Sequence, residues 1–171
     1  MTDLNPMGRA SIPKPMIRTP FFLLAAVIGI SASTASAQNR EVPYWASIRA
    51  EVMNTRVGPS KDYRIAWVYK RKGLPMKVIR VVEGWRLVED PAGDQGWVVS
   101  RLLNPERSAI VIGEGTTDIL AQPKRGAKIK WKAQPGVVGA LGKCDAGFCE
   151  FISDGHKGWV AENRLWGVGA P

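Results

Sequence analysis

The chain contains an internal repeat, which limits the folds that it can adopt. The segment GWVVSRLL at 96–103 is echoed by GWVAENRLW at 158–166, and the same alignment pairs Arg101 with Arg164. Two copies are too few for a solenoid, which needs at least about three repeats to be stable. The sequence therefore predicts a tandem pair of small modules rather than one large domain.

Short strand patterns fill each copy of the repeat. Runs rich in Val, Ile and Trp at 75–82, 85–89 and 96–99 are separated by turn-forming residues. At 127–133, lysines alternate with apolar residues, so one face of that strand is wet and the other is buried. No helical apolar stripe of useful length follows residue 37. This pattern predicts an all-β fold of two small barrels, an architecture that removes exposed sheet edges.

The first 37 residues have the composition of a secretory leader. Basic residues precede an apolar run at 21–30, and an Ala-Ser-Ala sequence follows at 35–37. The run is shorter than the roughly 20 residues of a membrane-spanning helix, although an uncleaved N-terminal anchor is the alternative. We expect export to the periplasm or cell envelope, with no stable membrane insertion after cleavage. The expected boundaries are 1–37 for the signal peptide, 38–104 for the first domain and 105–171 for the second.

The chain is basic, with 24 Lys and Arg against 15 Asp and Glu. In an exported protein, positive charge favours encounter with anionic envelope polymers rather than with nucleic acid. The same charge also suits an ordinary solvated surface, so it does not identify a ligand.

The first copy carries the most specific resemblance. MNTRVGPSKDYRIAWVYKRKGLP at 53–75, followed by GWRLVEDPAGDQGWV at 84–98, resembles the bacterial SH3-like domain family. The resemblance covers about 42–166, but the second copy has ILAQP in place of TRVGP, so Arg56 and Gly58 have no counterparts there. It implies a five-stranded SH3-like barrel for each copy and a non-enzymatic binding role, often in the cell envelope.

Cysteine and histidine are too scarce for most catalytic or metal sites. Cys144 and Cys149 are the only cysteines, and after export a disulfide is the default interpretation, with a reduced redox pair as the alternative. With His156 as the only histidine, neither a Cys–His hydrolase nor a tetrahedral zinc site has enough groups. A carboxylate pair for glycoside cleavage stays open, but no motif singles one out. We expect no enzyme activity, no metal and no cofactor.

Tryptophans that match between the copies are expected in the cores. Trp97 and Trp159 follow a glycine on the last long strand of each copy, and aromatic area dominates small cores. Trp67 matches Trp131, which lies opposite the lysine face, so Trp67 is expected in the core as well.

Tyrosines of the first copy are the remaining candidates for a binding surface. Tyr63 and Tyr69 stand where the second copy has alanine, so the fold does not require them, and an extended segment would place both on one face. Trp85 would complete the platform. In the alternative interpretation the tyrosines cap the barrel and the neighbouring basic run is a solvated loop. The candidate ligand-binding residues are Arg56, Asp62, Tyr63, Trp67, Tyr69 and Trp85.

An aromatic groove with basic flanks suits a peptide that bears carboxylates. We therefore expect a non-catalytic adaptor that recognises cell-envelope peptide or peptidoglycan through its first domain. The alternative is a docking scaffold for an exported envelope enzyme, with no affinity for the wall. The expected partner is thus a wall peptide or an envelope protein, and the oligomeric state is not predicted.

Overall fold

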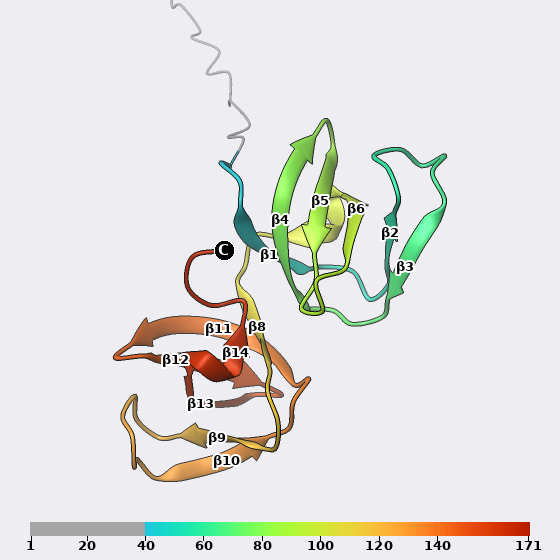
Figure 1. Ribbon diagram of the computed structural model, residues 1–171. Coiled ribbons are helices and arrows are strands. Elements are labelled where there is room, and N and C mark those ends of the chain that lie inside the picture. Colours follow the sequence, from blue (N-terminus) through green and yellow to red (C-terminus); the bar gives the residue numbers. More distant parts are fainter. Residues whose placement is uncertain (1–39) are drawn as a thin grey trace, which may run out of the picture. The chain divides into compact units, whose positions relative to one another are not determined.

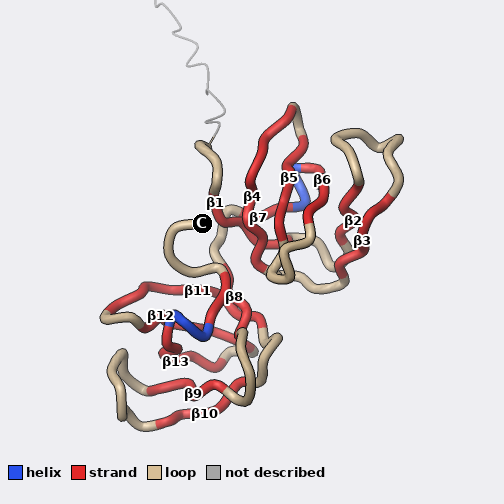
Figure 2. Tube along the Cα trace, viewed as in Figure 1, coloured by secondary structure: helices blue, strands red, loops and turns tan. Residues whose placement is uncertain are grey.

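Fourteen β-strands and two short 3-10 helices make up the regular structure of residues 40–171, the part of the chain that the computed structural model describes (Figures 1 and 2). These residues belong to one compact unit, 38–171. The predicted signal peptide lies outside the described residues. Among the described residues, no helix is long and apolar enough to cross a membrane.

The first seven strands form an antiparallel sheet in the order β3-β2-β6-β5-β4-β1-β7, which we call the first module. A 3-10 helix, Ser100–Leu102, precedes its last strand. The strands are β1 (Tyr44–Ile48), β2 (Met53–Arg56), β3 (Ile65–Tyr69), β4 (Pro75–Val82), β5 (Trp85–Glu89), β6 (Gln95–Val99) and β7 (Leu103–Asn104).

The second module repeats this arrangement, in the order β10-β9-β13-β12-β11-β8-β14. Its 3-10 helix is Glu162–Arg164. The strands are β8 (Ser108–Val111), β9 (Thr117–Leu120), β10 (Ile129–Ala133), β11 (Val138–Asp145), β12 (Phe148–Ser153), β13 (His156–Ala161) and β14 (Leu165–Trp166).

The predicted all-β tandem of SH3-like domains is confirmed, but the predicted five-stranded closed barrels are wrong. Each module is an open sheet of seven strands. In the first module β3 pairs only with β2 and β7 only with β1, so no ladder joins the two ends of the sheet among the described residues. In the second module, the corresponding terminal strands are β10 and β14.

Strand register corrects one detail of the repeat. Leu103 pairs with Ile48 in the first module, and Leu165 pairs with Val111 at the matching place in the second. The modules are therefore 62 residues apart at their last strands, and Arg101 corresponds to the residue before Arg164. The predicted match of Arg101 with Arg164 is wrong, because the one-residue gap falls earlier in the chain.

Each module has its own cluster of buried hydrophobic residues, although Ile110 of β8 and Val138 of β11 also pack against the first cluster. The first core is built around Met53, Met76, Val78, Val88 and Val98, all at most 1% exposed. The second is built around buried residues from β8, β9, β12 and β13, which include Val111, Ile119, Cys149, Phe151 and Val160. Because every one of these residues lies within 38–171, that fragment contains all that its two cores need.

Candidate ligand-binding site

The loop between β2 and β3, residues 57–64, holds a tyrosine ring against a glycine. A Cβ atom added to Gly58 would lie 2.5 Å from Cε2 of Tyr63, so this packing requires glycine. Tyr63 remains 48% exposed, and one part of its ring is therefore open to solvent. Arg56 donates a hydrogen bond from Nη1 to the Tyr63 carbonyl oxygen, which ties the loop to the end of β2.

Asp62 lies beside this tyrosine on the same loop. Ser60 Oγ donates to Asp62 Oδ2 at 2.8 Å, and the Asp62 amide donates back to Ser60 Oγ at 3.2 Å. Ser60, Asp62 and Tyr63 line a shallow hollow of about 330 Å³. The exposed carboxylate keeps acceptor capacity toward solvent, so the hollow can accept hydrogen bonds from an amine next to an aromatic surface.

Trp97 identifies the face of the first sheet that adjoins this loop. It pairs with Arg56 of β2 on one side and with Leu87 of β5 on the other. Its neighbour Val98 belongs to the first core, so strand alternation turns Trp97 to the opposite, outer face. Trp97 is only 9% exposed, yet it is not part of that core cluster. The prediction that Trp97 is buried is confirmed, but it covers the outer face.

Trp85 lies on the same outer face, farther along β5. It pairs with Val99, two residues beyond Trp97 on β6, and it is half-buried. The structure thus places Arg56 and Trp85 on one face, with Asp62 and Tyr63 on the loop that adjoins Arg56.

Trp67 is exposed, and its predicted place in the core is wrong. It is 54% exposed, although Thr55, its partner in β2, is 1% exposed and faces the core. In the second module the matching Trp131 packs against Phe151, with ring centroids 6.5 Å apart. Strand register puts Val88 at the place of Phe151. The smaller side chain gives Trp67 no large partner to pack against.

The sequence predicted that one extended segment places Tyr63 and Tyr69 on the same face, but the two tyrosines do not share a face. Tyr63 precedes β3 in a turn, whereas Tyr69 packs against the first core from the end of that strand. Its hydroxyl donates to Asp90 Oδ2 at 3.0 Å. Burial, together with the charge and hydrogen bond of Asp90, raises the pKa of Tyr69 well above its usual range. This tyrosine is therefore part of the packing of the module.

A groove in the second module was missed by the sequence analysis. It has a volume of about 470 Å³, and its lining includes Arg125, Ala127, Ile129, Phe148 and Arg164. Ala127, one of the lining residues, occupies the position of Tyr63. Arg164 is held in place, with Nε donating to Thr117 Oγ1 at 2.9 Å and Nη2 to the Glu114 carbonyl at 2.8 Å.

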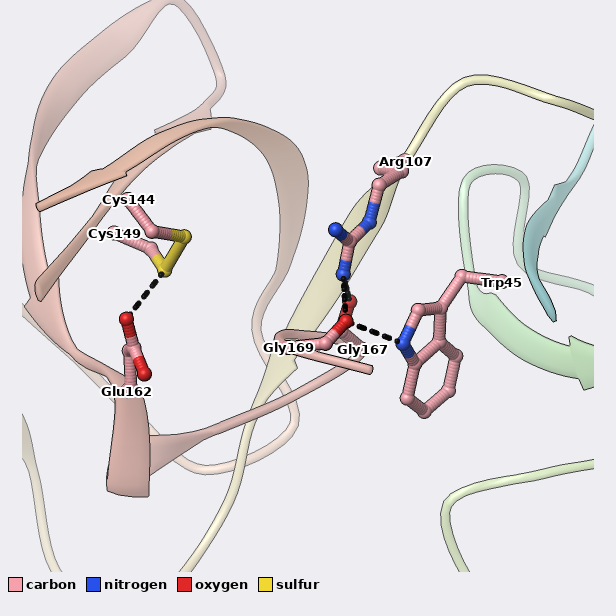
Figure 3. The surroundings of a disulfide bond; sticks show 7 residues. All are labelled: Trp45, Arg107, Cys144, Cys149, Glu162, Gly167 and Gly169. Carbon is pink, nitrogen blue, oxygen red and sulfur yellow. Dashed lines mark hydrogen bonds between the residues drawn. A yellow bond between two sulfur atoms is a disulfide. The ribbon is translucent and has the colours of Figure 1, made fainter. Parts of the chain in front are cut away.

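The predicted disulfide between Cys144 and Cys149 is present, and it joins β11 to β12 (Figure 3). Glu162 Oε1 lies 3.7 Å from Cys149 Sγ, a contact in which the bridged sulfur has no proton to donate. Within residues 40–171, these three residues are the one cluster of Cys, His, Asp or Glu at metal-ligating distances. Because both sulfurs are bridged, the cluster offers no thiolate to a metal.

Figure 3 also shows how the end of the chain is held. Arg107 donates from Nη2 to the carbonyl oxygens of Gly167 and Gly169, at 2.7 and 3.0 Å. Trp45 Nε1 donates to the same Gly169 oxygen at 3.2 Å. Burial lowers the pKa of Arg107. These contacts are structural, because they satisfy backbone carbonyls rather than open a site.

Comparison with known proteins places these modules in a family. The chain is 27% identical over 147 residues to a putative N-acetylmuramoyl-L-alanine amidase, YrvJ, of Bacillus subtilis strain 168. That match takes in 82% of this chain but only 27% of the relative, so the chain spans about a quarter of the relative's length.

Solved structures with some likeness include NlpC2 from Trichomonas vaginalis, at 12% identity and a TM-score of 0.33, covering 72% of this chain and 48% of that one. An NlpC/P60 family protein from Bacillus cereus ATCC 10987 also has 12% identity, with a TM-score of 0.32 and coverage of 71% and 55%. The family described as Bacterial SH3 domain matches residues 49–105 and 114–167, one match in each module and together more than half of the chain. The chain therefore belongs to the bacterial SH3 domain family.

Proposed function

We propose that this protein is an exported, non-catalytic adaptor whose first module binds peptide material of the cell wall. The observation that carries the proposal is the ordered loop in which Tyr63, half-exposed, is seated on Gly58 beside the Asp62 carboxylate. Export rests on the leader-like composition of residues 1–37.

The chemistry of the loop fits a short peptide with both amines and carboxylates. Asp62 can accept hydrogen bonds from an amine, the Tyr63 ring offers apolar contact, and the exposed cations Lys61 and Arg64 can pair with carboxylates. Similarity to a putative N-acetylmuramoyl-L-alanine amidase supports wall material as the ligand class. Because this chain spans only 27% of that relative, the similarity does not extend the relative's activity to it.

Co-sedimentation of residues 38–171 with purified peptidoglycan sacculi tests the proposal. We expect saturable binding that weakens steeply from about 0.1 M to 1 M salt, because the Debye length falls from about 10 Å to about 3 Å. Tyr63→Ala should lose at least tenfold in affinity. Val52→Ala is the matched control, since it also removes an exposed apolar side chain, 54% exposed, but lies before β2 and outside the loop.

Thermal melts of both variants should match the wild type, so that lost binding is not lost folding. Absence of sacculus binding at either salt concentration would overturn the proposal. The docking-scaffold alternative would then be preferred, and it has an observation of its own in the edge of the first sheet.

A further inference from the structure

β3 forms a free edge of the first sheet. It is the terminal strand and pairs only with β2 among the described residues, as Figure 1 shows. An unpaired edge presents backbone N–H and C=O groups that another strand can use, so proteins usually protect such edges. β3 carries apolar side chains instead, with Ile65 43%, Trp67 54% and Val68 48% exposed.

The second module shows what a protected version of this edge looks like. Strand register matches β10 with β3, so Lys130 and Lys132 stand where β3 has Ala66 and Val68. Lys130 donates to the Lys157 carbonyl oxygen, and Lys132 lies 3.5 Å from the Asp118 carboxylate. Lysine on an edge strand is a common device against strand pairing.

A register shift does not account for the difference between the two edges. Both β3 and β10 contain one at the matching place, between the isoleucine and the tryptophan of each strand. The two edges differ instead in their residues: β10 carries Lys130 and Lys132, and it is followed by Gln134 and Pro135 where Lys70 and Arg71 follow β3.

The charges around β3 indicate which kind of segment can pair with this edge. Arg64 precedes the strand and Lys70 and Arg71 follow it, all exposed and without an ion pair among residues 40–171. If two copies of this chain paired antiparallel through β3, Arg64 of each would lie beside the basic run of the other. Like charges placed opposite each other are destabilising, so the edge disfavours a second copy and favours a segment with acidic ends.

We propose that the β3 edge binds an extended segment of an envelope protein, apolar in the centre and acidic at both ends, by strand addition to the first sheet. Main-chain hydrogen bonds supply affinity in this mode, and alternate side chains supply specificity. Ile65, Trp67 and Val68 would contact the apolar centre. The inference goes beyond wall binding, because the same module would hold a protein at its edge and wall peptide at its loop.

Titration of residues 38–171 with a synthetic ten-residue peptide tests this surface. The probe alternates Val and Thr in the centre and has two Glu at each end. Two control peptides carry Lys at the ends, or Pro in the centre, which removes a backbone donor. We expect the amide signals of β3 and the indole signal of Trp67 to shift with the Glu-ended peptide and not with the controls.

Grafting the lysines of β10 onto β3 supplies the matched variant. Ala66→Lys/Val68→Lys should weaken peptide binding at least tenfold without lowering the melting temperature, because β10 shows that this strand tolerates both residues. The reciprocal variant, Lys130→Ala/Lys132→Val, should bind the Glu-ended peptide only weakly on β10, because Gln134 and Pro135 follow that strand where Lys70 and Arg71 follow β3. Tyr63→Ala should leave peptide binding intact, and the lysine graft should retain sacculus binding, so the two proposals can fail separately.

Three outcomes of the peptide titrations would overturn the inference. They are no binding of the Glu-ended peptide at millimolar concentration, equal binding to wild type and lysine graft, and shifts that map away from β3. A concentration-dependent dimer that the graft abolishes would also overturn it, because a second copy would then occupy the edge.

Discussion

Replacing Gly58 with alanine tests whether the glycine beneath Tyr63 creates the proposed wall-peptide site. The added Cβ would lie 2.5 Å from Tyr63 Cε2 and 2.6 Å from both Cδ2 and Cζ. Carbon atoms in contact normally lie about 3.5–4.0 Å apart, so the ring must move by about 1 Å or more. Gly58 does not have a positive φ, and alanine therefore adds no backbone strain of its own.

The exposure of the ring sets the expected magnitude. Full burial of a large apolar side chain contributes about 1.5–3 kcal/mol, and Tyr63 is 48% exposed. Since the ring can swing into solvent, Gly58→Ala should lower the free energy of unfolding by only about 1 kcal/mol. Sacculus binding should nevertheless fall as far as it does in Tyr63→Ala, because the platform is lost.

Urea denaturation and sacculus co-sedimentation of a four-member cycle measure both effects. The members are wild type, Gly58→Ala, Tyr63→Ala and the double variant, all as residues 38–171. If the alanine acts only through the ring, it should cost almost nothing once Tyr63 is removed, and the two changes should be strongly non-additive.

Gly96→Ala is the control for a crowded glycine elsewhere. Its Cβ would lie 2.7 Å from Cβ of Thr55, which is buried, so overpacking should cost about 1–3 kcal/mol while sacculus binding is kept. Wild-type sacculus binding by Gly58→Ala, or an effect that adds to that of Tyr63→Ala, would contradict this role of the glycine.

Three further predictions concern stability. Phe151→Ala, in the second core, should lower the free energy of unfolding by about 3–5 kcal/mol, measured by calorimetry. The raised pKa of Tyr69 means that the folded state holds this proton more tightly than the unfolded state does. The free energy of unfolding should therefore fall as pH rises above about 10. Tyr69→Phe should reduce this fall, measured by thermal melts from about pH 9 to 11. The cysteines of the Cys144–Cys149 bridge are five residues apart, so reducing it should lower the free energy of unfolding by about 2 kcal/mol. Urea titrations with and without reductant measure this change, and an unchanged midpoint would contradict it.

Local patterns predicted the parts of the fold that depend on neighbours in sequence. The repeat predicted two modules of one type, and the presence of only two cysteines in a chain expected to be exported predicted their bridge. Strands β7 and β14 have only two residues each, too few to show any alternation, which accounts for one of the two strands per module that the prediction of five left out.

The misplaced aromatic residues depend on contacts across the sheet. Trp131 packs against Phe151 on β12, and Trp67 is exposed where β5 has the smaller Val88 at the place of Phe151. That correspondence follows from strand register, which the alternation pattern does not give. Ala127, which stands where the first module has Tyr63, lines a groove that no local pattern predicted.

Pairing of the first and last strands has a consequence for how such proteins evolve. In the first module β1 pairs with β7, and in the second β8 pairs with β14, so the chain enters and leaves each module on adjacent strands. Domains whose ends lie close together tolerate insertion and permutation. Recombination can therefore duplicate, delete or transplant one of these modules as a cassette, without rebuilding a core. After duplication, one copy can gain edge lysines and a disulfide while the other keeps its open strand and its tyrosine loop.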